Sequence, residues 1–348
     1  MRKRTAFFIL IWIHIYLFAQ QGQNSILLVE RSVDRPLTVH KNQLQINAGY
    51  DFSMLSRRID ESGNIVNLSE AGIASAMHTF PLNIKYGILE FLEISAGTSY
   101  KKSGMRSEDY WTFSGSSKLH IQEINEHKGL EDMFMKMGLR LPFNLKSFDW
   151  SVSGSVTLPV AKYKPDKPDH EVILVEPVYD SYKFTYHYNN RFGTGVPTFK
   201  IRSAAKFRTE RTAIIASADY FKPFSSGENI HWKSRRIYEE FEYTGLPYKY
   251  LPSQVISCSG AFTYQAIAWF SQYIIIDYYK IYGGWSELTG KRVANEKRNY
   301  MFISFGFEIQ VSPYLRLSQL VELPGWGNNT DAPICFATNL SFNILTSK

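Results

Sequence analysis

Apolar and polar residues alternate along short segments that recur throughout this chain. In residues 43–54, QLQINAGYDFSM, six apolar side chains occupy the even positions, and six polar or small residues occupy the odd ones. A side-chain period of two indicates a β-strand with one apolar and one polar face. A soluble sandwich would bury the apolar face, whereas an outer-membrane barrel turns that face to lipid and the polar face to its lumen.

The same alternation predicts eleven further strands, which lie at residues 74–86, 92–100, 133–141, 150–160, 199–207, 214–220, 256–264, 270–278, 301–309, 315–317 and 334–344. A methionine stripe (Met133, Met135, Met137) has this period of two and is expected to face lipid. The sequence therefore predicts an all-β fold, a membrane-spanning antiparallel up-and-down barrel of about 12 strands.

The expected connections between these strands alternate in length. Short turns are expected near Gly87, Pro142, Arg208, Ala266 and Ser312. Long polar connections are expected at residues 58–70, 103–129, 162–195, 223–252, 282–297 and 324–333. Short periplasmic turns against long outer loops are typical of outer-membrane barrels. Residues 182–190 also alternate and are interpreted as a hairpin extension above the membrane, because a thirteenth spanning strand would make the number odd.

The first residues predict export. Arg2, Lys3 and Arg4 precede an uncharged apolar run at 6–18, and a cleavage site follows at Ala19. This is the layout of a cleaved secretory signal peptide, since the apolar run is short for a membrane-spanning helix; an uncleaved N-terminal anchor is the alternative. The predicted organisation is a signal peptide at 1–19, a periplasmic N-terminal lead at 20–42 and an outer-membrane barrel at 43–348.

Two motifs carry a resemblance to a known family. Asp34-Arg35-Pro36, the turn at 38–42 and the strand QLQINAG at 43–49 resemble the opening of the outer-membrane "transporter" family, also called the MetA-pathway of phenol degradation family. Gly129-Leu130-Glu131-Asp132, followed by Met-Gly-Leu at 137–139, is similar to the opening of that family's Gly-Leu-Gly-Asp strand. The chain departs from the pattern at Leu37, His40, Asn42 and Asn47. The resemblance covers the first and fourth strands and implies a β-barrel.

Composition excludes one class of partner and agrees with the barrel. Without Arg2, Lys3 and Arg4, 36 basic residues stand against 32 acidic ones, and this small, dispersed excess excludes a nucleic-acid-binding protein. Tyrosine is nearly as common as phenylalanine, in line with the aromatic girdles of barrels. The cysteines, Cys258 and Cys335, are predicted to be free thiols because the strand register points them to opposite faces.

The sequence offers no convincing catalytic or metal site, and no cofactor is expected. The His-x-Ser-Asn-Gly type motif of the twelve-stranded phospholipase barrels is absent, so a barrel enzyme is the weakest hypothesis. Ser114, Ser116 and Ser117 form a polar run, and His120 with His127 lack a defined scaffold for a metal. The acidic residues at 239–242 are expected to be solvated loop charges, with cation-bridged lipopolysaccharide contact as the alternative.

The polar faces of the predicted strands carry charges that a soluble core could not hold without partners or water. The lumen-facing candidates are Asp51, Lys85, Glu93, Lys136, Arg140, Lys200, Arg202, Lys206, Arg208, Asp219, Asp277 and Glu308. These residues predict a channel or facilitator for passive passage of a small solute in the outer membrane of a bacterium. An anionic solute is one possibility, and the family resemblance implies an aromatic solute as the other. The alternative is a structural or interaction barrel whose lumen is closed and whose loops bind a partner. Membrane lipid and lipopolysaccharide are the expected surroundings, and the oligomeric state stays open.

Overall fold

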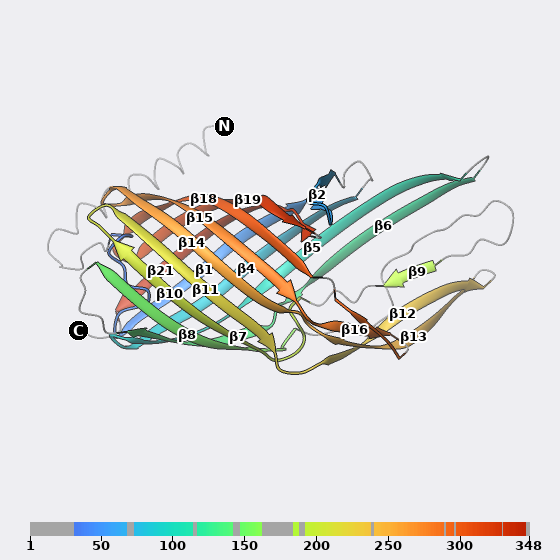
Figure 1. Ribbon diagram of the computed structural model, residues 1–348, viewed down its shortest axis with the longest axis horizontal. Coiled ribbons are helices and arrows are strands. Elements are labelled where there is room, and N and C mark those ends of the chain that lie inside the picture. Colours follow the sequence, from blue (N-terminus) through green and yellow to red (C-terminus); the bar gives the residue numbers. More distant parts are fainter. Residues whose placement is uncertain are drawn as a thin grey trace, which may run out of the picture.

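The strands form a closed barrel. The computed structural model describes residues 31–67, 73–113, 117–141, 147–161, 184–187, 192–237, 240–288, 290–295, 297–328 and 330–345. Twelve strands pair in the order β4-β1-β21-β19-β18-β15-β14-β11-β10-β8-β7-β5, and a β4–β5 pairing closes the ring. Every neighbouring pair is antiparallel, as the ribbon shows (Figure 1). The described part of the chain contains no apolar helix of membrane-spanning length.

All twelve predicted strands are present. Their bounds are β1 (Gln43–Leu55), β4 (Ile73–Leu89), β5 (Leu92–Phe113), β7 (Met133–Leu141), β8 (Phe148–Leu158), β10 (Thr198–Arg208), β11 (Thr212–Pro223), β14 (Gln254–Ile267), β15 (Phe270–Tyr282), β18 (Arg298–Ser312), β19 (Leu315–Asn328) and β21 (Ile334–Leu345). Closure leaves no unpaired edge among these strands, which is the condition for crossing lipid with β-structure.

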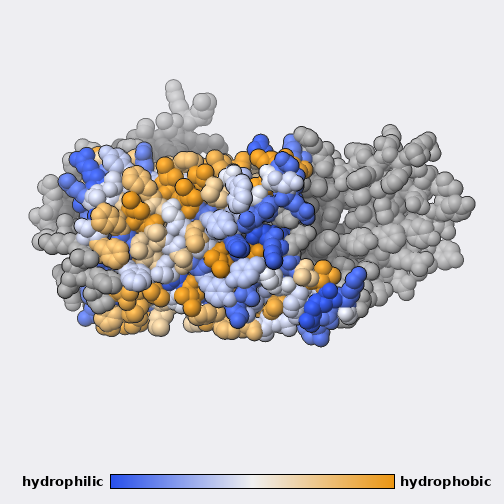
Figure 2. Space-filling view, viewed as in Figure 1, coloured by the Kyte–Doolittle hydropathy of each residue, from blue (hydrophilic) through white to orange (hydrophobic). Residues whose placement is uncertain are grey.

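Exposure alternates along the strands as the sequence predicts. On β7, Met135 and Met137 are 55% and 61% exposed, while Gly138 is buried. On β18, Phe305 is 49% exposed and its neighbour Ser304 only 1%. Apolar side chains cover much of the outer surface of the barrel strands, and hydrophilic side chains gather toward the end from which the long hairpins extend (Figure 2). The apolar face therefore points outward to lipid.

The short turns lie at one end of the barrel and the long connections at the other. Four short turns, at 89–92, 208–212, 267–270 and 312–315, are as expected, and the fifth, near Pro142, lies outside the described residues. Two long connections are hairpins that extend well beyond the barrel (Figure 1). One consists of β5 and β6 (Ser117–Leu130), and the other of β12 (Gly227–Ile237) and β13 (Glu240–Leu251).

Smaller strands complete the loop end. β9 (Phe184–His187), β16 (Trp285–Leu288) and β17 (Lys291–Ala294) join β12 and β13 in a separate five-stranded sheet. β2 (Arg57–Ile59), β3 (Ile65–Asn67) and β20 (Thr330–Asp331) form a three-stranded sheet. β9 lies within the segment interpreted as an extension and takes no part in the barrel sheet. Residues 103–129, expected as one polar connection, are instead largely strand, because the β5 ladder continues past the wall.

The two cysteines are unpaired, as predicted. Cys258 is exposed on β14, and Cys335 is half-buried on β21. Their strands are not neighbours in the barrel order, so no backbone ladder brings them together. The predicted signal peptide, at 1–19, lies outside the described residues.

Candidate functional site

Residues 31–42, here called the plug, lie inside the barrel at the end that carries the short turns. The plug contacts strands spaced around the closed ring, namely β4, β5, β8, β10, β14 and β18. A segment can meet so many walls only from within. Val33 is completely buried, Thr38 is 5% exposed and Val39 8%, so the plug packs closely against the wall.

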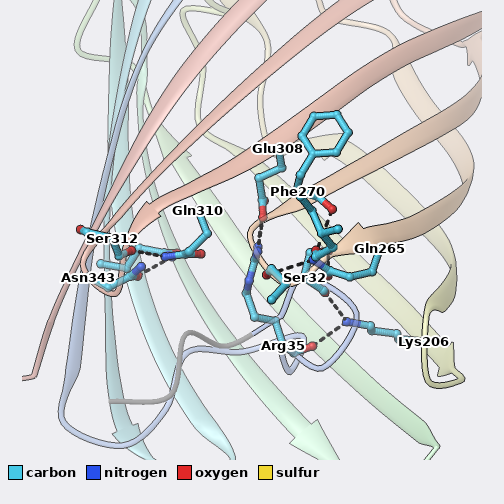
Figure 3. Close-up of polar contacts among 12 residues, drawn as sticks. Ser32, Arg35, Lys206, Gln265, Phe270, Glu308, Gln310, Ser312 and Asn343 are labelled. Atoms are coloured by element: carbon cyan, nitrogen blue, oxygen red, sulfur yellow. Dashed lines mark hydrogen bonds and ion pairs between the residues drawn. The ribbon is translucent and has the colours of Figure 1, made fainter. Parts of the chain in front are cut away.

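The first part of the plug is fastened to three strands by side-chain contacts (Figure 3). The Arg35 guanidinium makes a two-pronged ion pair with Glu308 on β18, in which Nη1 and Oε2 are 2.9 Å apart. Lys206 on β10 donates to the carbonyl oxygens of Ser32 and Arg35, at 3.2 and 2.7 Å. The Ser32 hydroxyl donates to Gln265 on β14 at 2.8 Å. A bidentate arginine–carboxylate pair fixes orientation as well as distance.

The second part of the plug is fastened through its backbone. The Leu37 amide donates to Asp149 at 2.8 Å, and the Val39 amide donates to Glu93 at 3.0 Å. Both carboxylates are buried, Asp149 at 6% exposure and Glu93 at 2%. Hydrogen bonds to an ionised group are roughly twice as strong as bonds between neutral groups, and dissolved salt screens them little when they are buried. These two bonds hold the amides of Leu37 and Val39 against the wall.

Basic residues on the neighbouring strands compensate these carboxylates. Lys136 on β7 lies 3.2 Å from Glu93, and Arg140 on the same strand lies 2.6 Å from Asp149. A buried carboxylate needs such a partner, because no other interaction would offset the free energy that the charge loses when its hydration is removed. Arg208 donates to the carbonyl oxygen of Asp34. Six of the twelve lumen candidates therefore meet at the plug, namely Glu93, Lys136, Arg140, Lys206, Arg208 and Glu308.

Gly87 is required where the plug joins the wall. A Cβ atom added there would lie 1.9 Å from the carbonyl oxygen of His40, so the plug backbone passes directly over this position. The Asn42 amide then donates to the Gly87 carbonyl at 2.7 Å. Asn42 has a φ of 59°, a left-handed conformation that asparagine tolerates better than most residues. This turn leads the chain from the plug into β1.

A cavity of about 680 Å³, here called the plug cavity, lies between the plug and the barrel wall. Residues of β1, β4, β5, β10, β11, β18, β19 and β21 line it together with the plug. The wall contributes mostly amides and hydroxyls, together with the charged side chains of Lys85, Glu93, Lys206 and Arg316. This volume is within the range of small-molecule sites, about 300–1,000 Å³. The plug thus narrows the lumen and leaves a space beside it that is lined largely by polar residues.

Of the remaining candidates, Lys85 lines the plug cavity and the others lie apart from the plug. Lys200 Nζ and Arg202 Nη1 lie 3.1 and 3.8 Å from the two oxygens of Asp219, so this carboxylate is shared. Arg202 also donates to the Ser217 hydroxyl at 3.0 Å. Asp51 and Asp277 make no ion pair within the part of the chain that the structure describes. The basic series on β10 is therefore divided between a carboxylate partner and the plug.

The Gly-Leu-Glu-Asp motif has a structural role at the loop end. Asp132 is 5% exposed and accepts hydrogen bonds from the amides of Ala161 and Gly195, at 3.2 and 3.0 Å. Its neighbour Glu131 accepts from the Ser99 hydroxyl at 2.7 Å and lies 2.9 Å from Lys101. Asp132 thus ties the connections after β8 and before β10 to the start of β7, and Glu131 ties the same point to β5.

No cluster of three metal-binding side chains occurs within the described ranges. Ser114 and Ser116 are outside the described residues, and His120 and His127 lie on β6 with side chains that the structure does not describe. The predicted charge cluster at 239–242 likewise has no described side chains.

Several residues of the site were not anticipated from the sequence. Asp149 precedes the predicted strand 150–160, and its odd number would have placed it on the inner face. The alternation along their strands also places Gln265 and Arg316 on the inner face, but both lie at strand ends, where apolar and polar residues no longer alternate regularly. In the sequence, Arg35 stands out only as part of the motif that resembles the transporter family. Nothing local in residues 31–42 shows that they enter the barrel.

Comparison with known proteins supports the fold alone. No protein-family model matches the sequence, and no curated protein matches it significantly. Among solved structures, an outer membrane channel from Pseudomonas putida F1 is similar with a TM-score of 0.61 at 10% identity, over 90% of this chain and 98% of that one. The CymD monoaromatic hydrocarbon channel has a TM-score of 0.48 at 9% identity, over 88% and 89% of the two chains. This chain thus shares the fold of outer-membrane barrels.

Proposed function

We propose that this protein is an outer-membrane channel for passive passage of a small solute, with its periplasmic opening narrowed by the plug. The observation that carries the proposal is a closed barrel whose interior holds a charged, polar lining and a 680 Å³ cavity beside an inserted segment. A barrel that served only as a scaffold would gain little from a cavity here. The fold shared with an outer membrane channel supports the same proposal.

A small hydrophilic solute fits this lining better than a large or purely apolar one. The residues around the plug cavity are largely amides, hydroxyls and charged groups. Conduction requires contacts strong enough to admit a solute and weak enough to release it. Amide and hydroxyl groups that face water meet this condition. The proposed direction of flow follows the concentration gradient of the solute.

The experiment is conductance in planar bilayers with the purified full-length protein and a variant that lacks residues 31–42. We expect small, discrete currents for the wild type and clearly larger currents for the variant, because the plug occupies part of the lumen. Heat-unfolded protein is the control. A wild type and a plug deletion that both fail to conduct would contradict the channel and favour the alternative, a closed barrel whose loops bind a partner.

A further inference from the structure

We propose that the plug cavity binds the carboxylate group of a small organic anion, with Lys85 as the cation that receives it. The proposal deepens the channel function and rests on it for the role of binding in passage. It names the class of solute, which the fold alone does not.

Basic residues predominate around the cavity. Its lining contains four basic side chains, Arg35, Lys85, Lys206 and Arg316, and one acidic side chain, Glu93. Arg35 is engaged by Glu308, and Lys206 donates to backbone carbonyl oxygens of the plug. Glu93 is already shared between Lys136 and the Val39 amide. The one acid of the lining is therefore committed to other partners.

Lys85 is the basic residue left over. It projects from β4 on the same face as Gly87, and its ammonium group makes no hydrogen bond or contact-distance ion pair with any residue that the structure describes; the charge of Glu93 acts on it from farther away. A half-buried ammonium loses part of its hydration, and that loss is returned only when an anion comes close. Arg316, 9% exposed on β19, faces the same cavity and adds positive potential.

Amide groups beside Lys85 provide the remaining donors. Gln45 lies directly across from Lys85 on β1, and Asn343 lies across from Gln45 on β21. Gln43 and Gln45 both donate to Asn343 Oδ1, at 3.1 and 2.9 Å, which orients the Asn343 amide nitrogen as a donor that none of the described residues uses. One ammonium and one neutral N–H group match the two oxygens of a singly charged carboxylate.

The test uses the purified full-length protein in detergent and two probes of similar shape, benzoate and neutral benzamide. Calorimetric titration should detect benzoate binding to the wild type, with benzamide at least about tenfold weaker, as a charged hydrogen bond of this strength requires. Lys85→Gln should weaken benzoate binding by about tenfold or more without changing benzamide binding. Lys280→Gln is the matched control, because Lys280 is exposed on β15 and does not line the cavity.

A second variant separates loss of the site from loss of the fold. Lys85→Arg keeps the charge and should retain benzoate binding within a few-fold. Wild-type protein that binds neither probe, or a Lys85→Gln variant that binds benzoate as the wild type does, would overturn the carboxylate site. Conductance of the same preparations tests the channel separately: benzoate binding without current would refute the channel alone, and current without benzoate binding would refute the site alone.

Discussion

At the scale of single residues, the faces of each strand follow opposite rules. Phe305 is exposed to lipid, whereas Ser259 faces inward and lies across from Asp277 on the neighbouring strand. Phe305→Arg is expected to lower the free energy of unfolding by about 2–4 kcal/mol, because it places a charge in the apolar band. Ser259→Arg should cost much less, since the lumen is polar and Asp277 can pair with it. Urea unfolding in lipid vesicles measures both, and equal costs would contradict the assignment of the two faces.

A second residue-scale prediction concerns the plug anchors. Glu93→Gln removes the charge that holds both the Val39 amide and Lys136. We expect a loss of about 1–3 kcal/mol of stability, because a strong hydrogen bond weakens and an ammonium loses its partner. Single-channel recording should also show longer open periods. Glu228→Gln, an exposed residue at the loop end, is the control and should leave both quantities unchanged. Unchanged gating in Glu93→Gln would mean that this carboxylate does not hold the plug closed.

At the scale of elements, the sequence predicted the wall well and left open whether the segment before the first strand plugs the lumen. A strand is specified locally, since its period of two is repeated within a dozen residues. The plug is specified by contacts at long range: the Leu37 amide meets a carboxylate 112 residues away, and the Val39 amide one 54 residues away. Every non-proline residue carries such an amide, so donors of this kind leave no mark in the sequence.

The sequence predicts a polar connection where the structure has the β5–β6 hairpin, and the reason is related. Residues 103–129 are polar on both sides, so they lack the apolar face that marks a spanning strand. Backbone pairing with a neighbour still makes them strands, since β5 and β6 continue one ladder from Tyr100 and Leu130 outward. The change from an alternating to a polar sequence therefore indicates where the apolar outer face ends, whereas the strand itself continues.

The plug itself gives an element-scale prediction. Its anchored amides should exchange with solvent slowly, because exchange requires release from buried carboxylates. Hydrogen-exchange mass spectrometry should report strong protection for residues 35–40 and weak protection for the exposed turn at 60–64. Asp149→Asn, which removes one anchor charge, is expected to raise exchange in the plug and leave the β18–β19 ladder protected. Exchange in the plug as fast as in the turn would show that it does not stay in the barrel.

At the scale of the whole molecule, the interior charges set the ion preference. Around the plug, Glu93, Asp149 and Glu308 are matched by Lys136, Arg140 and Arg35. Lys206 and Arg208 on β10 donate to carbonyl oxygens of the plug. Farther along β10, two cations share the single carboxylate of Asp219. Among the twelve lumen candidates seven are basic and five are acidic, so the count leaves a small positive excess in the lumen.

A moderate preference for anions follows for the wild type, and it should be stronger in dilute salt because ions screen the lumen less there. Lys200→Glu combined with Arg202→Glu should shift the reversal potential in a salt gradient toward cations, since the pair faces the lumen away from the plug. The plug contacts of Lys206 and Arg208 stay intact in this variant, so the current itself should persist. Lys280→Gln with Lys222→Gln, two exposed positions on the outer surface, controls for the loss of two basic residues. Cation preference in the wild type, or the same reversal potential in the wild type and the double variant, would mean that groups other than the basic residues of β10 select the ion.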